Sequence, residues 1–258
     1  MDKNNSSTII DKTFSYPFSE VTFSNFLHNI FDKINLIDSS IWLGNSLIPN
    51  NFKESVEQYK ILGTYRDNNN NLILMAMIKL ADRNAVEKSR YIQRDFSRWL
   101  INKFNADACL FSFSSDNYED WRFSFIKIDF TREITKSGKL KATENISPLK
   151  RYSYLVGKNE PNHTAQIQLS PLLLDENKNP SIEQITEAFS VEKVTENFYR
   201  DYLNIFNKFE EHLLNIYHFS NQDLRMYTQV LFNRLMFIRF VEKKNWLKFN
   251  NSFNYLNE

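Results

Sequence analysis

The chain contains little cysteine and little glycine, and its net charge is close to zero. Each of these properties excludes a class of structure or binding site. The 258 residues contain one cysteine, Cys109, so an intramolecular disulfide framework is excluded. The four glycines lie far apart, which excludes a glycine-rich loop of the kind that binds S-adenosylmethionine. Because the formal net charge is +1, any contact with nucleic acid has to come from a local basic patch.

Long apolar runs are also missing. No apolar segment approaches the ~18 residues of a membrane span. The first residues, Met1 to Ser6, lack the basic start and apolar block of a signal peptide. We therefore expect a cytoplasmic protein without membrane contact. Phenylalanine is abundant instead, at 23 residues, and this predicts a large aromatic core.

The clearest pattern lies between Ala106 and Thr164. Residues 121–130 nearly alternate bulky apolar and polar side chains, which is the period of a half-buried strand. A second apolar run at 108–113 precedes them, and the polar residues 114–120 between the two runs predict a loop joining antiparallel strands. Residues 151–157 continue the sheet pattern.

The residues before this stretch predict a helix, a hairpin and a second helix. Apolar side chains recur at helical spacing from Phe18 to Ile37 and again from Ala85 to Phe104. Between these helices, strands on either side of Asp67–Asn71 predict a hairpin, because Asn and Asp tolerate tight turns. This order is compatible with a mixed α/β sandwich. Residues 1–15 are expected to be frayed, and residues 131–148 to form a loop.

From about residue 180 onward the apolar spacing is helical. Residues 194–214 and a second run from about 221 to 245 each predict a long helix. The sequence therefore predicts an α/β domain over residues 1–175, followed by an all-α region over residues 176–258.

A set of short segments, in a fixed order, resembles the N-terminal region of large single-chain restriction-modification proteins. The segments are Asp-Trp-Arg-Phe-Ser-Phe at 120–125, Arg-Tyr-Ser-Tyr-Leu-Val-Gly at 151–157, Glu-Pro-Asn-His-Thr-Ala at 160–165, Glu-Ala-Phe-Ser-Val-Glu-Lys-Val-Thr at 187–195, and the run at 232–247. The resemblance covers roughly residues 60–247. It implies a restriction-endonuclease-like domain and a helical connector that leads into an adenine-specific DNA methyltransferase and a target-recognition region.

A nuclease of this type needs acids to hold Mg²⁺ and a lysine to stabilise charge or orient the attacking water. The usual arrangement is an Asp near one strand and an acid-x-Lys triplet on the next. The nearest equivalents here are Asp67 and Met77-Ile78-Lys79. The candidate catalytic residues are therefore Asp67 and Lys79, with Asp67 as the candidate metal ligand. Since Met77 cannot ligate Mg²⁺, the site is either degenerate or served by acids elsewhere, such as Glu57 or Asp82.

Candidate DNA contacts come from two places. Arg90, Arg94 and Arg98 are each four residues apart and share a helix face, with Gln93 beside them. Such a face can contact duplex phosphates, or it can simply be solvated. The other candidates are Arg151 and Lys158, which lie in the polar and aromatic segment 151–164. They can contact DNA or a methyltransferase domain, or the segment is only an interdomain packing strap.

Three functions remain open from the sequence. The first is a nuclease-like, DNA-contacting part of a restriction-modification system that is degenerate or incomplete as a nuclease. The second is an active Mg²⁺-dependent endonuclease with relocated acids. The third is a non-catalytic module that binds a separately encoded methyltransferase. The chain itself has neither the glycine-rich loop for S-adenosylmethionine nor an Asn-Pro-Pro-Tyr loop that would grip a flipped base, so we expect no methyltransferase activity.

Overall fold

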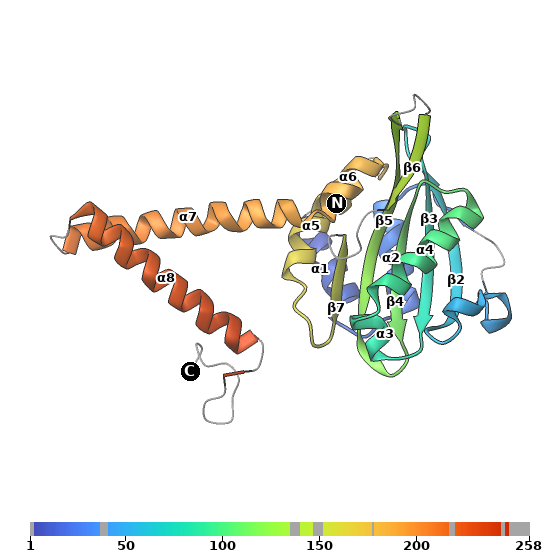
Figure 1. Ribbon diagram of the computed structural model, residues 1–258, viewed down its shortest axis with the longest axis horizontal. Helices are drawn as coiled ribbons and strands as arrows, with labels where there is room; N and C mark the ends of the chain where they lie inside the picture. Colours follow the sequence, from blue (N-terminus) through green and yellow to red (C-terminus); the bar gives the residue numbers. More distant parts are fainter. Residues whose placement is uncertain are drawn as a thin grey trace. The chain divides into compact units, whose positions relative to one another are not determined.

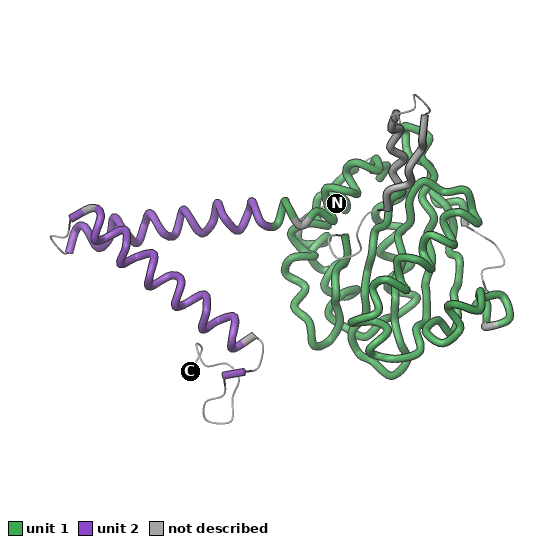
Figure 2. Tube along the Cα trace, in the orientation of Figure 1, with its two compact units in different colours: residues 1–194 green, residues 195–258 purple. Residues whose placement is uncertain are grey.

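The computed structural model describes residues 3–36, 41–134, 140–146, 152–176, 178–216, 220–243 and 246–247. The chain divides into two compact units, residues 1–194 and residues 195–258 (Figure 2). None of the described helices is long and apolar enough to cross a membrane.

The first unit is built on a mixed sheet (Figure 1). Its strands are β1 (Asn35–Leu36), β2 (Val56–Arg66), β3 (Leu72–Leu80), β4 (Ala108–Ser115), β5 (Tyr118–Ile134), β6 (Leu140–Ile146) and β7 (Ser153–Gly157). The strands are ordered β1-β2-β3-β4-β5-β6, and β7 pairs with the first part of β5. All pairs are antiparallel except β3 and β4, which run parallel. The predicted mixed α/β class is confirmed.

Helices cover both faces of this sheet. The first face carries α1 (Lys3–Phe14), α2 (Glu20–Ile30), α5 (His163–Leu174) and α6 (Ile182–Ala188). The second face carries α3 (Arg83–Glu87) and α4 (Arg90–Phe104). Figure 1 shows α3 and α4 on one side of the strands and α1 and α2 on the other. Because α4 connects the parallel strands β3 and β4, it is the crossover helix that parallel pairing requires.

The strand β3 contributes side chains to the hydrophobic cores on both faces of the sheet. Its side chains alternate, so Ile73, Met75 and Met77 enter the first-face core, whereas Leu74 and Ala76 enter the second. A strand buried on both faces is apolar throughout, as the sequence pattern of residues 72–80 predicts.

Aromatic side chains dominate the first-face core, as the abundance of phenylalanine predicts. Trp121 of β5 stacks on Phe14 of α1 at 5.3 Å between ring centroids, and it meets Phe23 of α2 edge-on at 5.7 Å. Phe123 contacts Phe189, just after α6, at 5.0 Å. Each such pair contributes about 0.5–1.5 kcal/mol beyond the area that it buries. These contacts hold α1, α2 and the residue after α6 against β5, although they lie far apart in the sequence.

Several predicted boundaries are wrong. Residues 3–14 are not frayed, because they form α1, whose Ile10 and Phe14 are fully buried. The predicted loop at 131–148 contains the end of β5 and the whole of β6 within its described part. The predicted helix over 85–104 is two helices, with Asp82 capping the first.

The division between the units also lies later than the expected one at residue 175. Ile182, Ile185 and Ala188 of α6 are buried in the first-face core, so residues 176–194 belong with the sheet. The second unit holds most of α7 (Val191–Ile216) and all of α8 (Asn221–Lys243), which together agree with the helical pattern predicted there.

Candidate functional site: two polar surfaces on opposite faces of the sheet

The acid-x-Lys position lies at the end of β3. Met77 is fully buried in the first-face core, where a thioether packs well and a carboxylate would be costly. Lys79 lies two residues further along, on the same face. Its Nζ forms an ion pair with Asp116 at 3.0 Å and lies 5.3 Å from the centre of the Trp42 ring. Asp116 and the Trp42 ring therefore hold the ammonium group of Lys79 in place.

Asp67 does not join Lys79. In the β2–β3 register, Arg66 pairs with Leu72 at one end of the hairpin and Gln58 pairs with Lys79 at the other. Asp67 and Lys79 are therefore separated by nearly the full length of β3, a distance of about 24 Å at the usual rise of an antiparallel strand. The prediction that they form one catalytic site is wrong.

The carboxylate of Asp67 is occupied by structural hydrogen bonds. Its two oxygens accept from the backbone N–H of Asn69 at 2.9 Å, of Asn71 at 2.8 Å and of Ile182 at 3.0 Å, and from the side-chain amide of Asn71 at 2.9 Å. Burial acts to raise the pKa of Asp67, but these hydrogen bonds outweigh it and the pKa is lowered. The role of Asp67 is to close the β2–β3 turn and hold the start of α6, which corrects its assignment as a metal ligand.

A polar cluster lies beside Lys79 on the first face. Lys60 of β2 is directly opposite Met77 in the strand register, and its ammonium forms an ion pair with Glu20 at the start of α2. The Trp42 indole N–H donates to the other oxygen of Glu20 at 3.3 Å. A cation therefore stands next to the position where a nuclease would place its second acid. Sequence reasoning missed this cluster because its members are far apart in the chain.

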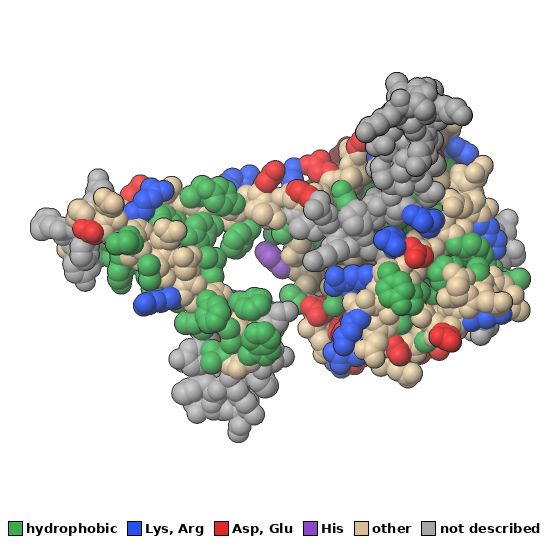
Figure 3. Space-filling model, viewed as in Figure 1, with side chains coloured by type: hydrophobic (Ala, Val, Ile, Leu, Met, Phe, Trp, Pro, Cys, Tyr) green, Lys and Arg blue, Asp and Glu red, His purple; other side chains and the backbone are tan. Residues whose placement is uncertain are grey.

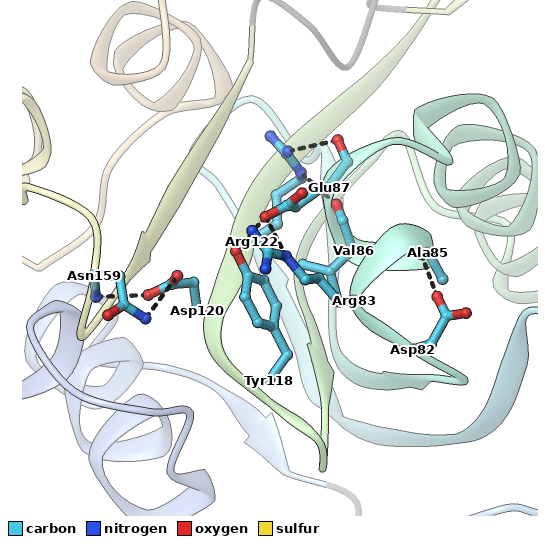
Figure 4. A network of polar contacts seen from close by, with 9 residues as sticks. All are labelled: Asp82, Arg83, Ala85, Val86, Glu87, Tyr118, Asp120, Arg122 and Asn159. Atoms are coloured by element: carbon cyan, nitrogen blue, oxygen red, sulfur yellow. Dashed lines mark hydrogen bonds and ion pairs between the residues drawn. The ribbon is translucent and has the colours of Figure 1, made fainter. Parts of the chain in front are cut away.

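The alternative acids do not assemble there either. Asp82 caps α3, where its carboxylate accepts from the Ala85 backbone N–H at 2.8 Å (Figure 4). Glu57 is exposed on β2. Within the described ranges, no group of three or more His, Cys, Asp or Glu side chains is placed to hold a metal ion.

The predicted arginine face lies on α4, over the second face of the sheet. Arg90 is exposed at the start of the helix, and Arg94 and Arg98 are partly exposed along the same flank. Arg94 forms an ion pair with its neighbour Asp95 at 3.0 Å. In the space-filling view, Lys and Arg side chains occur with Asp and Glu side chains near them on this side of the first unit (Figure 3). The flank is therefore basic but partly neutralised.

Gln93 is not part of that surface. It is fully buried, and its amide donates to the carbonyl oxygens of Ala85 at 2.6 Å and Val86 at 2.9 Å. These carbonyls belong to the last turn of α3, where backbone acceptors need partners. Gln93 fastens α3 to α4 and cannot contact DNA, so its predicted role is wrong.

Arg122 of β5 is a basic residue that sequence reasoning assigned only to the polar side of a strand. Its guanidinium donates to the Val86 carbonyl at 3.3 Å and to the Ser153 hydroxyl at 3.0 Å (Figure 4 shows the contact with α3). Burial, followed by the nearby positive charge of Arg90, lowers the pKa of Arg122 to about 10. Arg122 and Arg90 thus place two positive charges close together at the junction of α3, α4 and β5.

The two remaining predicted DNA contacts have different outcomes. Lys158 is described, and it forms an ion pair with Glu119 at 2.6 Å that lowers the pKa of the Glu119 carboxyl. Beside it, Asp120 accepts from the backbone N–H of Asn159 at 2.8 Å (Figure 4). These contacts tie the segment after β7 to the start of β5 within the first unit, so they are structural contacts inside one unit and do not test the expected interdomain strap. Arg151 lies outside the described residues.

The two polar surfaces lie on opposite faces of the sheet. Met77 and Lys79 belong to the face under α2, whereas α4 shares the core of the other face with Ala76 and Ile78. A single site cannot combine Lys79 with the arginines of α4.

Comparisons with known proteins add no relative. A scan against protein-family models, a search of curated proteins and a search of solved structures each found no match.

Proposed function

We propose that this chain is the N-terminal, nuclease-like part of a restriction-modification system, and that it contacts duplex DNA through α4 without cutting it. The order of α2, the antiparallel strands β1, β2 and β3, the crossover helix α4 and the parallel strand β4 supports a restriction-endonuclease-like fold. The methyltransferase and target-recognition regions would be in the same protein or separately encoded, and α7 and α8 would be the connector toward them.

The observation that carries the absence of cleavage is the pairing of Lys60 with Met77 across β2 and β3. Mg²⁺ requires hard oxygen ligands, and here a thioether occupies the acid position with an ammonium group opposite it. An ammonium group beside a metal would repel it. Glu20, the carboxylate that pairs with Lys60, is already neutralised by it. Lys79 then remains as a residue bound to Asp116 rather than as part of a metal site.

The basic flank of α4 supports the contact with DNA. Arg90 and Arg94 are accessible, and Arg122 adds a fixed positive charge beneath Arg90. Glu87, a nearby acid on α3, is engaged by the Tyr118 hydroxyl and by Arg83 at 2.9 Å, so it compensates Arg90 less (Figure 4). Contacts of this type bind phosphates without reading sequence.

The test is a gel-shift series with duplex DNA at several salt concentrations. Arg90→Ala combined with Arg94→Ala should weaken binding equally for unrelated sequences and reduce the salt slope by roughly two units. The matched control is Lys53→Ala with Arg66→Ala, which removes one exposed cation in the segment before β2 and one at the end of β2, and should leave the slope unchanged. Equal DNA binding by the folded α4 variant and the parent would contradict the proposal.

The cleavage part is tested separately with supercoiled plasmid and Mg²⁺ or Mn²⁺. The parent chain should leave the plasmid intact. Cleavage that disappears in Lys79→Ala would instead support an active endonuclease.

A further inference from the structure

The helix α8 has two apolar sides, and α7 covers only one of them. Phe232 of α8 packs against Tyr202, Phe206 and Phe209 of α7, with ring centroids 5.4–5.7 Å apart. Leu224 is buried with this side. The α7-facing side therefore already has its partner.

The opposite side of α8 carries a second, exposed stripe. Met226, Val230, Phe237 and Phe240 are 60%, 43%, 66% and 50% exposed, and Asn233 lies exposed in the middle of them. Phe240 keeps this exposure although its ring also meets Trp246 edge-on at 6.2 Å. In the space-filling view, hydrophobic side chains gather at the C-terminal end of α8 (Figure 3). This set, called here the α8 stripe, is spaced 4, 3, 4 and 3 residues apart. That is the a/d spacing of a coiled coil, so the fitting partner is another helix.

The size of the α8 stripe matches what a stable interface needs. Its four apolar residues expose roughly 400 Å² together, if each large side chain has about 150–250 Å² to bury. A standard interface buries about 800 Å² per partner, of which a little over half is apolar. One helix presented by each partner is therefore sufficient.

The composition of the α8 stripe favours a second copy of this chain. We propose that α8 pairs in parallel with α8 of a second copy, so that Asn233 meets Asn233 and each apolar residue meets its own equivalent. With Val230 and Phe237 at a positions, Asn233 occupies a d position of this repeat. Pairing Asn233 with its equivalent gives each amide a polar partner, whereas a shifted register would bury it against an apolar side chain. The flanking positions are Tyr227, Gln229, Arg234 and Met236, so like charges barely oppose self-association. In a parallel pair Arg234 faces Gln229, whereas in an antiparallel pair it would approach its own equivalent.

Sedimentation equilibrium of the full chain between about 1 and 100 μM tests the pairing. The expected mass is twice 30.8 kDa at the upper end of the range. Phe237→Glu should weaken the dimer at least about 30-fold, because truncation of a central aromatic residue typically costs that much. Tyr91→Glu changes an equally exposed aromatic residue on α4 and should leave the mass unchanged.

Two further variants keep the proposal testable if Phe237→Glu unfolds α8. Asn233→Leu should tighten association, because it replaces the polar residue of the seam. Met226→Cys should form an interchain disulfide under mild oxidation, whereas Tyr91→Cys should not. The native Cys109 is buried and does not compete.

Other occupants of the α8 stripe would give different results. A monomer at all concentrations, with Asn233→Leu also monomeric, overturns the proposal and leaves the stripe to the first unit of the same chain or to another protein. A dimer in which Met226→Cys fails to cross-link overturns the parallel arrangement.

Discussion

Replacing Asp67 with alanine should destabilise the first unit strongly, because this carboxylate holds two distant segments together. The residue is 6% exposed, and its oxygens accept hydrogen bonds from Asn69, Asn71 and Ile182. In the variant, the buried Ile182 N–H loses a charged acceptor, and the partly buried turn donors of Asn69 and Asn71 exchange theirs for water. At about 1–3 kcal/mol for the buried donor left unpaired, and less for each turn donor, the expected loss is about 2–4 kcal/mol. The melting temperature should fall by about 10 °C.

The same residue predicts a dependence on pH. Since the pKa of Asp67 is lower in the folded chain than its ordinary value, ionised Asp67 stabilises the fold above about pH 4, the pKa of an unfolded Asp. That contribution disappears as the pH falls through the lower, folded pKa. Stability of the parent should therefore decrease more steeply below pH 4 than stability of Asp67→Ala.

Urea unfolding followed by tryptophan fluorescence measures both effects. Three of the four tryptophans, at positions 42, 99 and 121, lie in the first unit, and Trp246→Phe in every variant removes the fourth. Asp116→Ala is the control, because that carboxylate is 67% exposed and should contribute at most about 1 kcal/mol. A loss of less than about 1 kcal/mol in Asp67→Ala would refute the reasoning and reopen a catalytic role for this residue.

Three other predictions concern Gly157, Cys109 and Lys79. Gly157→Ala should cost several kcal/mol in urea unfolding, because φ is +138° and a Cβ would lie 2.5 Å from Asp120 Cα, whereas Gly44→Ala meets nothing within 4 Å and should be nearly neutral. The Cys109 thiol, whose pKa is raised by burial, should resist iodoacetamide in the folded chain and react only after unfolding; fast labelling under native conditions would contradict its burial. Lys79→Ala should change the free energy of unfolding by less than about 1 kcal/mol, because its partner Asp116 is largely exposed, and a larger loss would show a buried role.

The central strands were predictable because their signal is local. Alternation along residues 121–130 and the continuous apolar run at 72–80 identify β5 and β3, and the Asp/Asn cluster identifies the turn between β2 and β3. Asn70 indeed adopts a positive φ of 65°. By contrast, α1 has few apolar residues among Asn, Ser and Lys, and its stability comes from Phe14 packing on Trp121, which lies more than one hundred residues away.

The candidate site was harder to predict because it depends on long-range pairing. Gln93 is polar and was expected to face solvent, but the carbonyls of α3 lie next to it in space and require donors. The ion pair of Lys60 with Glu20 joins a strand to a helix forty residues earlier. The spacing of apolar and polar residues along the sequence does not predict contacts between such distant segments. That Lys79 and Arg94 lie on different faces depends on the side of the sheet on which α4 crosses, which residue spacing does not specify.

The attachment of α6 to the β2–β3 turn has a practical consequence for anyone who shortens this chain. A cut at residue 175 removes Ile182, Ile185 and Phe189 from the aromatic core. It also removes the Ile182 backbone N–H, which donates a hydrogen bond to Asp67. Each lost side chain would forfeit about 1.5–3 kcal/mol, comparable in sum with the whole stability of a domain. Such a fragment should aggregate or be degraded, whereas one that ends near residue 194 keeps α6 together with the other helices of the first unit.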